Sequence, residues 1–167
     1  CAQRGERVFV GGFRHPPNAD AMLWFGREIF PRIRARLPDV RLHCIGAEPP
    51  TEVRALQEIP GVTVHGHVPD LAPYMDGVRV AIAPLRFGGG VKGKVLESLR
   101  FGVPCVTTPT GMQGLGAAAG FMPACADAKA FAAHVVHLLD SDDDWRRVSK
   151  ASRQFIADHY SREALWS

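Results

Sequence analysis

The sequence has no apolar run that approaches the roughly 20 residues needed to span a membrane as a helix. Residues 1–10 lack the long apolar segment of a secretory signal peptide, so no leader is expected. The formal net charge is only +3, and the basic side chains are scattered rather than gathered into a stripe. A transmembrane protein and a nucleic-acid-binding protein are therefore both disfavoured.

Cysteine is also scarce, with four residues and no C-x-x-C pair. Three of the four lie in apolar stretches, where a cysteine usually acts as a small buried hydrophobic residue. We therefore expect neither disulfides nor a metal site, and the pattern suits a reducing compartment, so we expect a cytoplasmic protein. The first residue is Cys1 rather than Met, which suggests a fragment of a longer protein.

What the sequence does contain is a regular alternation of short apolar runs with amphipathic segments. The expected strands are continuous apolar runs, so both faces of each strand should be buried, which predicts a parallel sheet covered by helices on both sides. A length of 167 residues suffices for one such α/β domain. We expect a single Rossmann-like domain over residues 1–167 with about six strands. The expected strands are 7–12, 41–47, 61–68, 78–85, 104–108 and 120–126, and the expected helices are 17–38, 51–59, 70–77, 91–102, 127–140 and 142–160.

Several residues predict how these helices begin and end. Asn18 is a candidate N-cap for the first helix, and Pro31 is expected to bend or break it. Gly102 is expected at the C′ position that closes the helix at 91–102. Trp145 flanks the last helix and is a candidate to face a partner domain that this chain lacks.

Glycines follow four of the five main strands, at the edge where ligands bind in open parallel sheets. Bare backbone lets a phosphate or a sugar approach the N–H groups closely. Glycine in a single loop usually means only a tight turn, but four such loops on one edge favour a binding site. The glycines are Gly11, Gly12, Gly46, Gly66, Gly88, Gly89 and Gly90, and the fifth strand leads into Thr108, Thr110 and Gly111.

The stretch FGGGVKGKVLES, residues 87–98, partly matches two nucleotide-binding motifs. A P-loop requires Ser or Thr after its lysine, and Val95 stands there instead. A dinucleotide fingerprint requires an acidic residue at the end of the next strand, which here ends in Thr107 and Thr108. Both motifs are therefore rejected.

The same stretch does place Lys94 and Glu97 on one face of a helix that follows a glycine loop. The helix N-terminus and Lys94 suit a diphosphate, and a carboxylate is a good acceptor for the two hydroxyls of a ribose. Glu97 and Lys94 together therefore fit a nucleoside diphosphate. From these residues alone, a solvated Lys94–Glu97 ion pair is an equally good interpretation.

The stretch PLRFGGGVKGKVLESLRFGVPCVTTPTGMQGL, together with VGGF, PPNADAMLWF, LHCIGA and VTVHGHVPDLAPYM, resembles the donor-binding half of group 1 retaining glycosyltransferases. These enzymes have the GT-B fold, in which two Rossmann-like domains enclose the active site. The resemblance implies that this chain is the C-terminal domain, which binds a UDP- or GDP-sugar. It implies that the N-terminal acceptor domain is absent and that no metal or other cofactor is needed.

The resemblance also assigns roles to individual residues. Glu97 matches the second glutamate of the family's Glu-x7-Glu motif, which binds ribose, whereas Gly89 stands in place of the first. Arg14 and Lys94 are expected to hold the diphosphate, with Arg86 as a weaker candidate. Val68 is expected near the base, and Gly111 near the donor sugar. The expected donor-binding residues are Gly12, Arg14, Val68, Gly88, Gly89, Gly90, Lys94, Glu97 and Gly111, and no catalytic residue is assigned.

The function expected is transfer of a hexose-type sugar with retention, by the full-length protein rather than by this fragment. Two alternatives stay open: a nucleotide-sugar epimerase of GT-B fold, and a non-catalytic nucleotide-binding module. Any membrane contact is expected to be peripheral and made through the missing half. His65 and His67 lie two apart in a predicted strand, but the sequence offers no third ligand, so we interpret them as structural.

Overall fold

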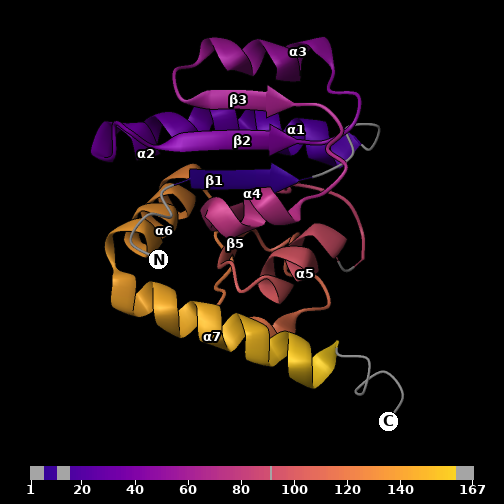
Figure 1. Ribbon diagram of the computed structural model, residues 1–167, viewed down its shortest axis with the longest axis vertical. Helices are drawn as coiled ribbons and strands as arrows, with labels where there is room; N and C mark the ends of the chain where they lie inside the picture. The colour runs from indigo at the N-terminus through magenta and orange to yellow at the C-terminus, as the bar shows by residue number, and fades with distance from the viewer. Residues whose placement is uncertain (1–5, 11–15, 91, 161–167) are drawn as a thin grey trace.

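The computed structural model describes residues 6–10, 16–90 and 92–160 of the 167. Its centre is a parallel sheet of five strands in the order β3-β2-β1-β4-β5 (Figure 1). The predicted α/β fold with a parallel sheet is thus confirmed. The strands are β1 (Glu6–Val10), β2 (Arg41–Ile45), β3 (Val62–His65), β4 (Val78–Ala83) and β5 (Cys105–Thr107).

The sixth predicted strand, 120–126, is reduced to one parallel bridge between Thr107 and Ala124. Cys125 N–H donates to the Thr107 carbonyl oxygen at 2.9 Å, which holds the segment beside β5. Pro123 precedes the bridge and has no N–H to offer a ladder. The expectation of about six strands is therefore corrected to five strands and a bridge.

Helices cover both faces of the sheet. One face carries α1 (Pro16–Trp24), α2 (Phe30–Arg36), α3 (Thr51–Arg54) and α6 (Ala128–Asp140), whose buried side chains share one apolar cluster with strand residues. The other face carries α4 (Ala72–Gly77) and α5 (Gly93–Arg100), and α7 (Asp142–His159) packs against α5 and α6. Short 3₁₀ turns occupy Ala55–Glu58 and Gly116–Ala118. In the described ranges, no helix is both long and apolar enough to cross a membrane.

The predicted helix 17–38 is divided by a π-helical segment, Phe25–Ile29, between α1 and α2. Phe30 N–H donates to the Phe25 carbonyl oxygen, five residues back. Pro31 follows Phe30 and has no N–H to donate a backbone hydrogen bond. The interruption of the helix that Pro31 predicted therefore occurs in the turn before it, as this π-helical segment. Asn18 lies inside α1 rather than at its N-cap, so that prediction is wrong.

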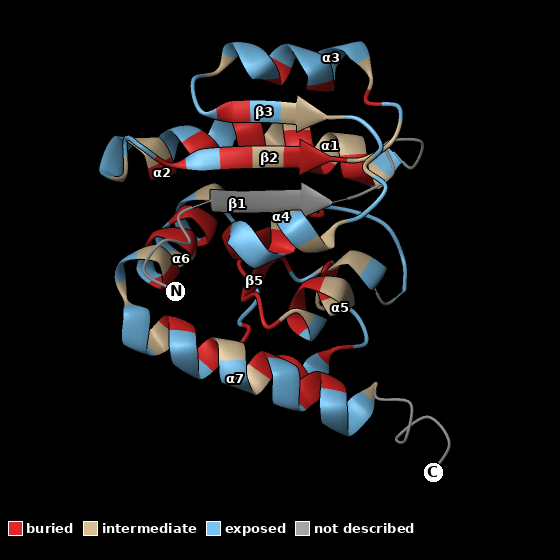
Figure 2. Ribbon diagram, in the orientation of Figure 1, coloured by how far each residue is buried: buried red, intermediate tan, exposed pale blue. Residues whose placement is uncertain are grey.

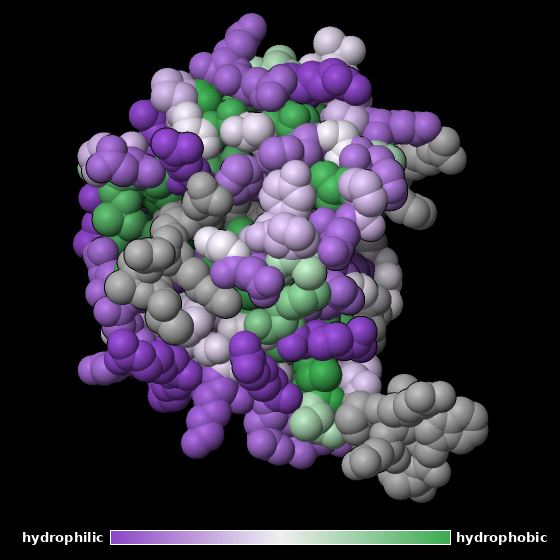
Figure 3. All heavy atoms as spheres, in the orientation of Figure 1, coloured by the Kyte–Doolittle hydropathy of each residue, from purple (hydrophilic) through white to green (hydrophobic). Residues whose placement is uncertain are grey.

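The apolar core contains a group of aromatic rings between α1, the π-helical segment and α6. Phe25 packs edge-on against Phe131 with ring centroids 5.9 Å apart, and both are fully buried. Figure 2 shows buried residues along the inward faces of the helices, while Figure 3 shows a mainly hydrophilic surface over α3 and α7. Burying such side chains is the main stabilising contribution to a domain of this size.

Trp145 belongs to this packed interior, not to an exposed surface. Its side chain is 5% exposed, and Nε1–H donates to the Arg79 carbonyl oxygen at 2.7 Å. The prediction that Trp145 faces a missing partner domain is therefore wrong. Its indole lies on the inward face of α7 and donates its hydrogen bond to β4 of the same domain. Gly102 is confirmed at the end of α5, with a φ of +70° that favours glycine.

Candidate functional site

The carboxyl ends of the parallel strands share one edge of the sheet, and residues 84–92 connect β4 to α5 at this edge. Two contacts fix this connection to α1. The Arg86 guanidinium binds the Asp20 carboxylate through two hydrogen bonds of 2.9 and 2.6 Å and lies 5.3 Å from the centre of the Trp24 ring. Gly88 lies against Pro17, since a Cβ added there would be 3.3 Å from Pro17 Cγ.

Two of the three consecutive glycines of this connection have a backbone conformation that other residues rarely adopt. Gly88 has φ of +112° and Gly90 has φ of +78°, whereas a Cβ on Gly89 would meet nothing within 4 Å. The Lys92 ammonium folds back over the loop and donates to the carbonyl oxygens of Gly89 (2.7 Å) and Gly90 (2.8 Å). These bonds place a positive charge beside the glycines at the start of α5.

Lys94 lies in the first turn of α5, half-buried, and its ammonium donates to Oδ1 of Asn18 on α1. Burial and the nearby charge of Lys92 lower the pKa of Lys94 to about 8, although the Cys105 thiol acts in the opposite direction. The contact with Asn18 therefore holds the ammonium at the start of α5. An anion beside it would raise its pKa.

Glu97 lies one turn further along α5 and is 42% exposed. Its Oε2 is 3.8 Å from Arg100 Nη1, a weak surface ion pair within the helix. Glu97 and Lys94 nevertheless line the same small pocket, which is closed on the α4 side by Leu71 and Met75. The structure therefore brings these two predicted residues together, each with a different polar partner.

Val68 and Gly111 follow the two outer strands of the sheet, β3 and β5. Val68 follows β3 and packs against the apolar cluster under α4, which includes Met75 and Ala81. Gly111 N–H donates to Thr108 Oγ1 at 3.2 Å, so its backbone is packed against the end of β5. The loop that contains it folds into successive turns.

Two predicted residues, Gly12 and Arg14, lie outside the described residues. Arg86, the weaker candidate for a phosphate-binding cation, is paired with Asp20 through the two hydrogen bonds described above. Sequence reasoning missed the parts played by Asn18 and Lys92. Lys92 is adjacent to the glycine loop, so its position in the sequence could have indicated its role. Asn18 is 76 residues away from its partner Lys94, and the sequence indicated only a possible helix cap at this position.

The histidines form a pair other than the one that sequence spacing suggested. His65 on β3 lies beside His43 on β2, with 3.0 Å between Nε2 of His65 and Nδ1 of His43, and Tyr74 packs edge-on against both rings. No group of three or more His, Cys, Asp or Glu residues arranged for a metal ion occurs within the described part of the chain.

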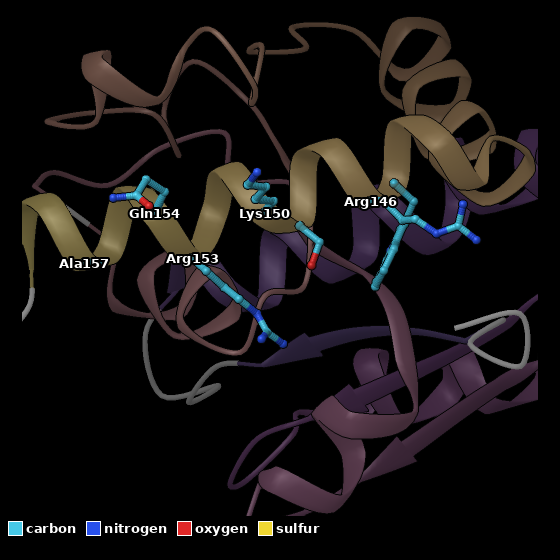
Figure 4. Close-up of a pocket in the computed structure, with 7 residues that line it drawn as sticks. Arg146, Lys150, Arg153, Gln154 and Ala157 are labelled. Atoms are coloured by element: carbon cyan, nitrogen blue, oxygen red, sulfur yellow. The ribbon is translucent and has the colours of Figure 1, made fainter.

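A second, broad hollow of about 600 Å³ runs along α7, well separated in sequence from the glycine loop. Figure 4 shows Arg146, Lys150 and Arg153 at intervals along this helix. Arg146 pairs with Asp143 at 3.4 Å, and Arg153 donates to the Phe101 carbonyl oxygen. None of the sequence-predicted site residues lies there.

Comparison with known proteins decides the family. Residues 5–141 match the family described as "Glycosyl transferases group 1". The chain belongs to the group 1 glycosyltransferases. Among sequence relatives of this glycosyltransferase chain, the "Uncharacterized 44.6 kDa protein in cps region" of Klebsiella pneumoniae is 24% identical over 169 residues, covering 96% of this chain and 44% of the relative.

Solved structures show the same fold. TarM of S. aureus, in complex with fondaparinux, alpha-GlcNAc-glycerol and UDP, superposes with a TM-score of 0.81 at 12% identity, covering 98% of this chain and 34% of TarM. The sucrose-phosphate synthase of Thermosynechococcus elongatus superposes with a TM-score of 0.76 at 18% identity, covering 99% of this chain and 43% of that protein. The glycosyltransferase chain thus spans less than half the length of these proteins.

Proposed function

We propose that this chain is the donor-binding domain of a glycosyltransferase that moves a hexose-type sugar from UDP or GDP to an acceptor, with retention at the anomeric carbon. The observation that carries the proposal is the placement of Lys94 and Glu97 one turn apart on α5, a helix that begins directly after a glycine loop at the carboxyl edge of the sheet. Membership of the group 1 family supports glycosyl transfer, and the TarM structure with UDP supports a nucleotide-linked donor.

In this proposal the charges at the start of α5 are matched to the parts of the donor. The Lys94 ammonium and the N-terminus of α5 attract the diphosphate, together with Arg14. The exposed Glu97 carboxylate accepts hydrogen bonds from the two ribose hydroxyls. Val68 contributes to the surface under the base, and the loop that contains Gly111 lies toward the donor sugar.

The chemistry that these groups support is departure of the diphosphate. The bond between the anomeric carbon and the diphosphate oxygen breaks, and the electron pair stays on that oxygen. Lys94 then faces a more negative partner than in the ground state, so its attraction strengthens as the bond breaks. An acceptor hydroxyl held by the rest of the protein forms the new bond to the anomeric carbon and passes its proton to the departing diphosphate. The isolated domain is expected to bind nucleotide without turnover.

Thermal unfolding with added nucleotide tests the proposal. A nucleotide at one hundred times its Kd should stabilise the domain by about 2.7 kcal/mol, and UDP, GDP and ADP are compared to identify the base. Glu97→Gln should remove most of this protection, because an uncharged amide is a weaker acceptor for the ribose hydroxyls. Glu58→Gln, on an exposed residue of the 3₁₀ turn after α3, is the matched control.

The outcomes separate the proposal from its alternatives. If no nucleotide protects the wild-type chain, the donor-binding proposal is wrong and an interaction module is favoured. If nucleotide protects but the full-length protein releases a sugar changed at C2, it is an epimerase. A transferred sugar with the anomeric configuration of the donor, identified by NMR, supports the retaining transferase.

A further inference from the structure

A hollow of about 490 Å³ opens at the edge of the sheet where β2 and β3 begin, opposite the edge that carries the glycine loop. The end of α2 lies beside the starts of these two strands and forms one wall (Figure 1). The volume is in the range of small-molecule sites, roughly 300–1,000 Å³. Polar residues that line the hollow include Arg34, Asp39, Arg41 and Thr63.

Arg34, in the last turn of α2, has a donor that the rest of the domain does not satisfy. Its side chain is half-buried, and no acceptor in the described part of the chain bonds its buried Nε–H. Buried donors almost always have an acceptor, because leaving one unpaired is unfavourable. The helix C-terminus favours a basic residue at this place but does not supply that acceptor. An oxygen atom of a ligand in the hollow would supply it.

Arg41, the first residue of β2, is exposed and lines the same hollow. Across residues 6–10, 16–90 and 92–160, neither Arg41 nor Arg34 forms an ion pair or a side-chain hydrogen bond. The hollow thus has two guanidinium groups, from different elements, whose hydrogen-bonding capacity is not used within the domain.

Asp39 is the acidic residue in the lining of the hollow. It is exposed, and it pairs with neither Arg34 nor Arg41 among the described residues. Residues 32–41 contain four arginines and one aspartate, so the net charge of this segment is +3. A concentration of positive charge around a hollow raises the local concentration of anions.

The class of anion follows from the groups that face the hollow. A guanidinium can bind either a carboxylate or a phosphate through two hydrogen bonds. One guanidinium already occupies both oxygens of a carboxylate, whereas a phosphate group has three terminal oxygens to share between two guanidiniums and a hydroxyl. We propose that this hollow binds a phosphate group, with Arg34 and Arg41 as its cationic ligands and Thr63 as a further hydrogen-bond donor. The inference does not depend on donor binding at the opposite edge.

The first test follows the ¹⁵N-labelled chain by NMR while inorganic phosphate or pyrophosphate is added at constant ionic strength. The Nε–H signal of Arg34 and the amide signals of Gly61 and Thr63 should shift saturably. Arg34→Gln and Arg41→Gln should each weaken binding about tenfold, because each removes charge-assisted hydrogen bonds. Asp39→Asn should strengthen it about threefold, because it removes a like charge from the hollow.

Arg27→Gln is the matched control, because Arg27 is exposed and does not line the hollow. It removes the same charge and should change the affinity by less than about twofold. Amide signals of Gly93 and Lys94 report separately on phosphate that binds at the start of α5. Circular dichroism checks folding, and exposed Arg41 can be replaced with little effect on the fold even if a variant of Arg34 unfolds.

The second test separates a soluble phosphate compound from a lipid head group. The chain is sedimented with vesicles of phosphatidylglycerol, and zwitterionic phosphatidylcholine vesicles are the control. Co-sedimentation that Arg41→Gln abolishes identifies a lipid phosphate as the ligand. Saturable binding of free phosphate or pyrophosphate without co-sedimentation identifies a soluble one.

Two results would overturn the inference. One is a loss of affinity in Arg34→Gln and Arg41→Gln no larger than in Arg27→Gln, which would leave only non-specific attraction between charges. The other is the absence of saturable shifts with either phosphate together with no binding to the anionic vesicles. Both results leave the donor proposal intact, because UDP and GDP test that site independently.

Discussion

Gly111→Ala offers a direct test of how tightly the loop after β5 is packed. A Cβ on Gly111 would lie 1.7 Å from Thr107 Oγ1, 3.1 Å from Thr107 Cβ and 3.4 Å from the Ala83 carbonyl oxygen. Contacts below about 3 Å do not occur, so either the backbone or the threonine must move. Thr107 is fully buried and its hydroxyl donates to the Ala83 carbonyl oxygen at 2.8 Å, so rotating it breaks a buried hydrogen bond.

The expected magnitude follows from these two costs. Overpacking a buried position costs about 1–3 kcal/mol, and a buried hydroxyl without its partner costs about 1–3 kcal/mol more. We therefore expect Gly111→Ala to lower the free energy of unfolding by roughly 2–6 kcal/mol, measured by urea denaturation. Gly116→Ala is the matched control, because a Cβ there meets nothing within 4 Å and should change stability by less than about 0.5 kcal/mol.

A double variant shows whether the clash is the cause. Thr107→Ala removes the atom that the new methyl group would meet, so Thr107→Ala/Gly111→Ala should be less destabilised than the sum of the single changes by about 1 kcal/mol or more. A Gly111→Ala protein as stable as the wild type would refute the packing argument. So would strictly additive effects of the two changes.

Three further predictions concern titration and buried groups. Because the folded pKa of Lys94, about 8, lies below its ordinary 10.5, the unfolded chain binds more protons between these values. Its contribution to stability should therefore rise with pH in that window, and Lys94→Met should remove this slope from urea-denaturation midpoints. Trp145→Phe, which removes the Nε1–H bond to Arg79, should cost about 1 kcal/mol in the same assay. Burial raises the pKa of Cys44 and Cys105 to about 12, so a thiol reagent at pH 8 should label both only after denaturation.

The alternation of apolar and amphipathic segments was enough to predict the sheet, because a strand buried on both faces is a nearly continuous apolar run, whereas a helix that covers it is apolar on one face only. The prediction of a sixth strand was wrong because Pro123 has no N–H to extend the pairing beyond a single bridge. A short run of apolar residues has the same sequence pattern in a strand and in a segment that forms only one bridge. Pro31 predicted an interruption but not its form, since a π turn depends on which carbonyl accepts the bond from Phe30.

The candidate site was predicted best where its residues are neighbours in sequence. Lys94 and Glu97 lie three apart on one helix, so their shared pocket follows from helical geometry. Asn18 could not be found in this way, because its contact with Lys94 depends on how α1 and α5 pack. For the same reason the sequence does not reveal that Arg86 pairs with Asp20, which lies 66 residues away.

The central position of β1 has a consequence for how the chain acquires its fold. This strand pairs with β2 on one side and with β4 on the other, although it is the first of the five strands to be synthesised. Its second neighbour ends at Ala83, so half of its hydrogen-bonding groups must wait for more than seventy further residues to be synthesised. Deleting Glu6–Val10 would leave two separate pairs of strands, β2 with β3 and β4 with β5, with no strand to join them.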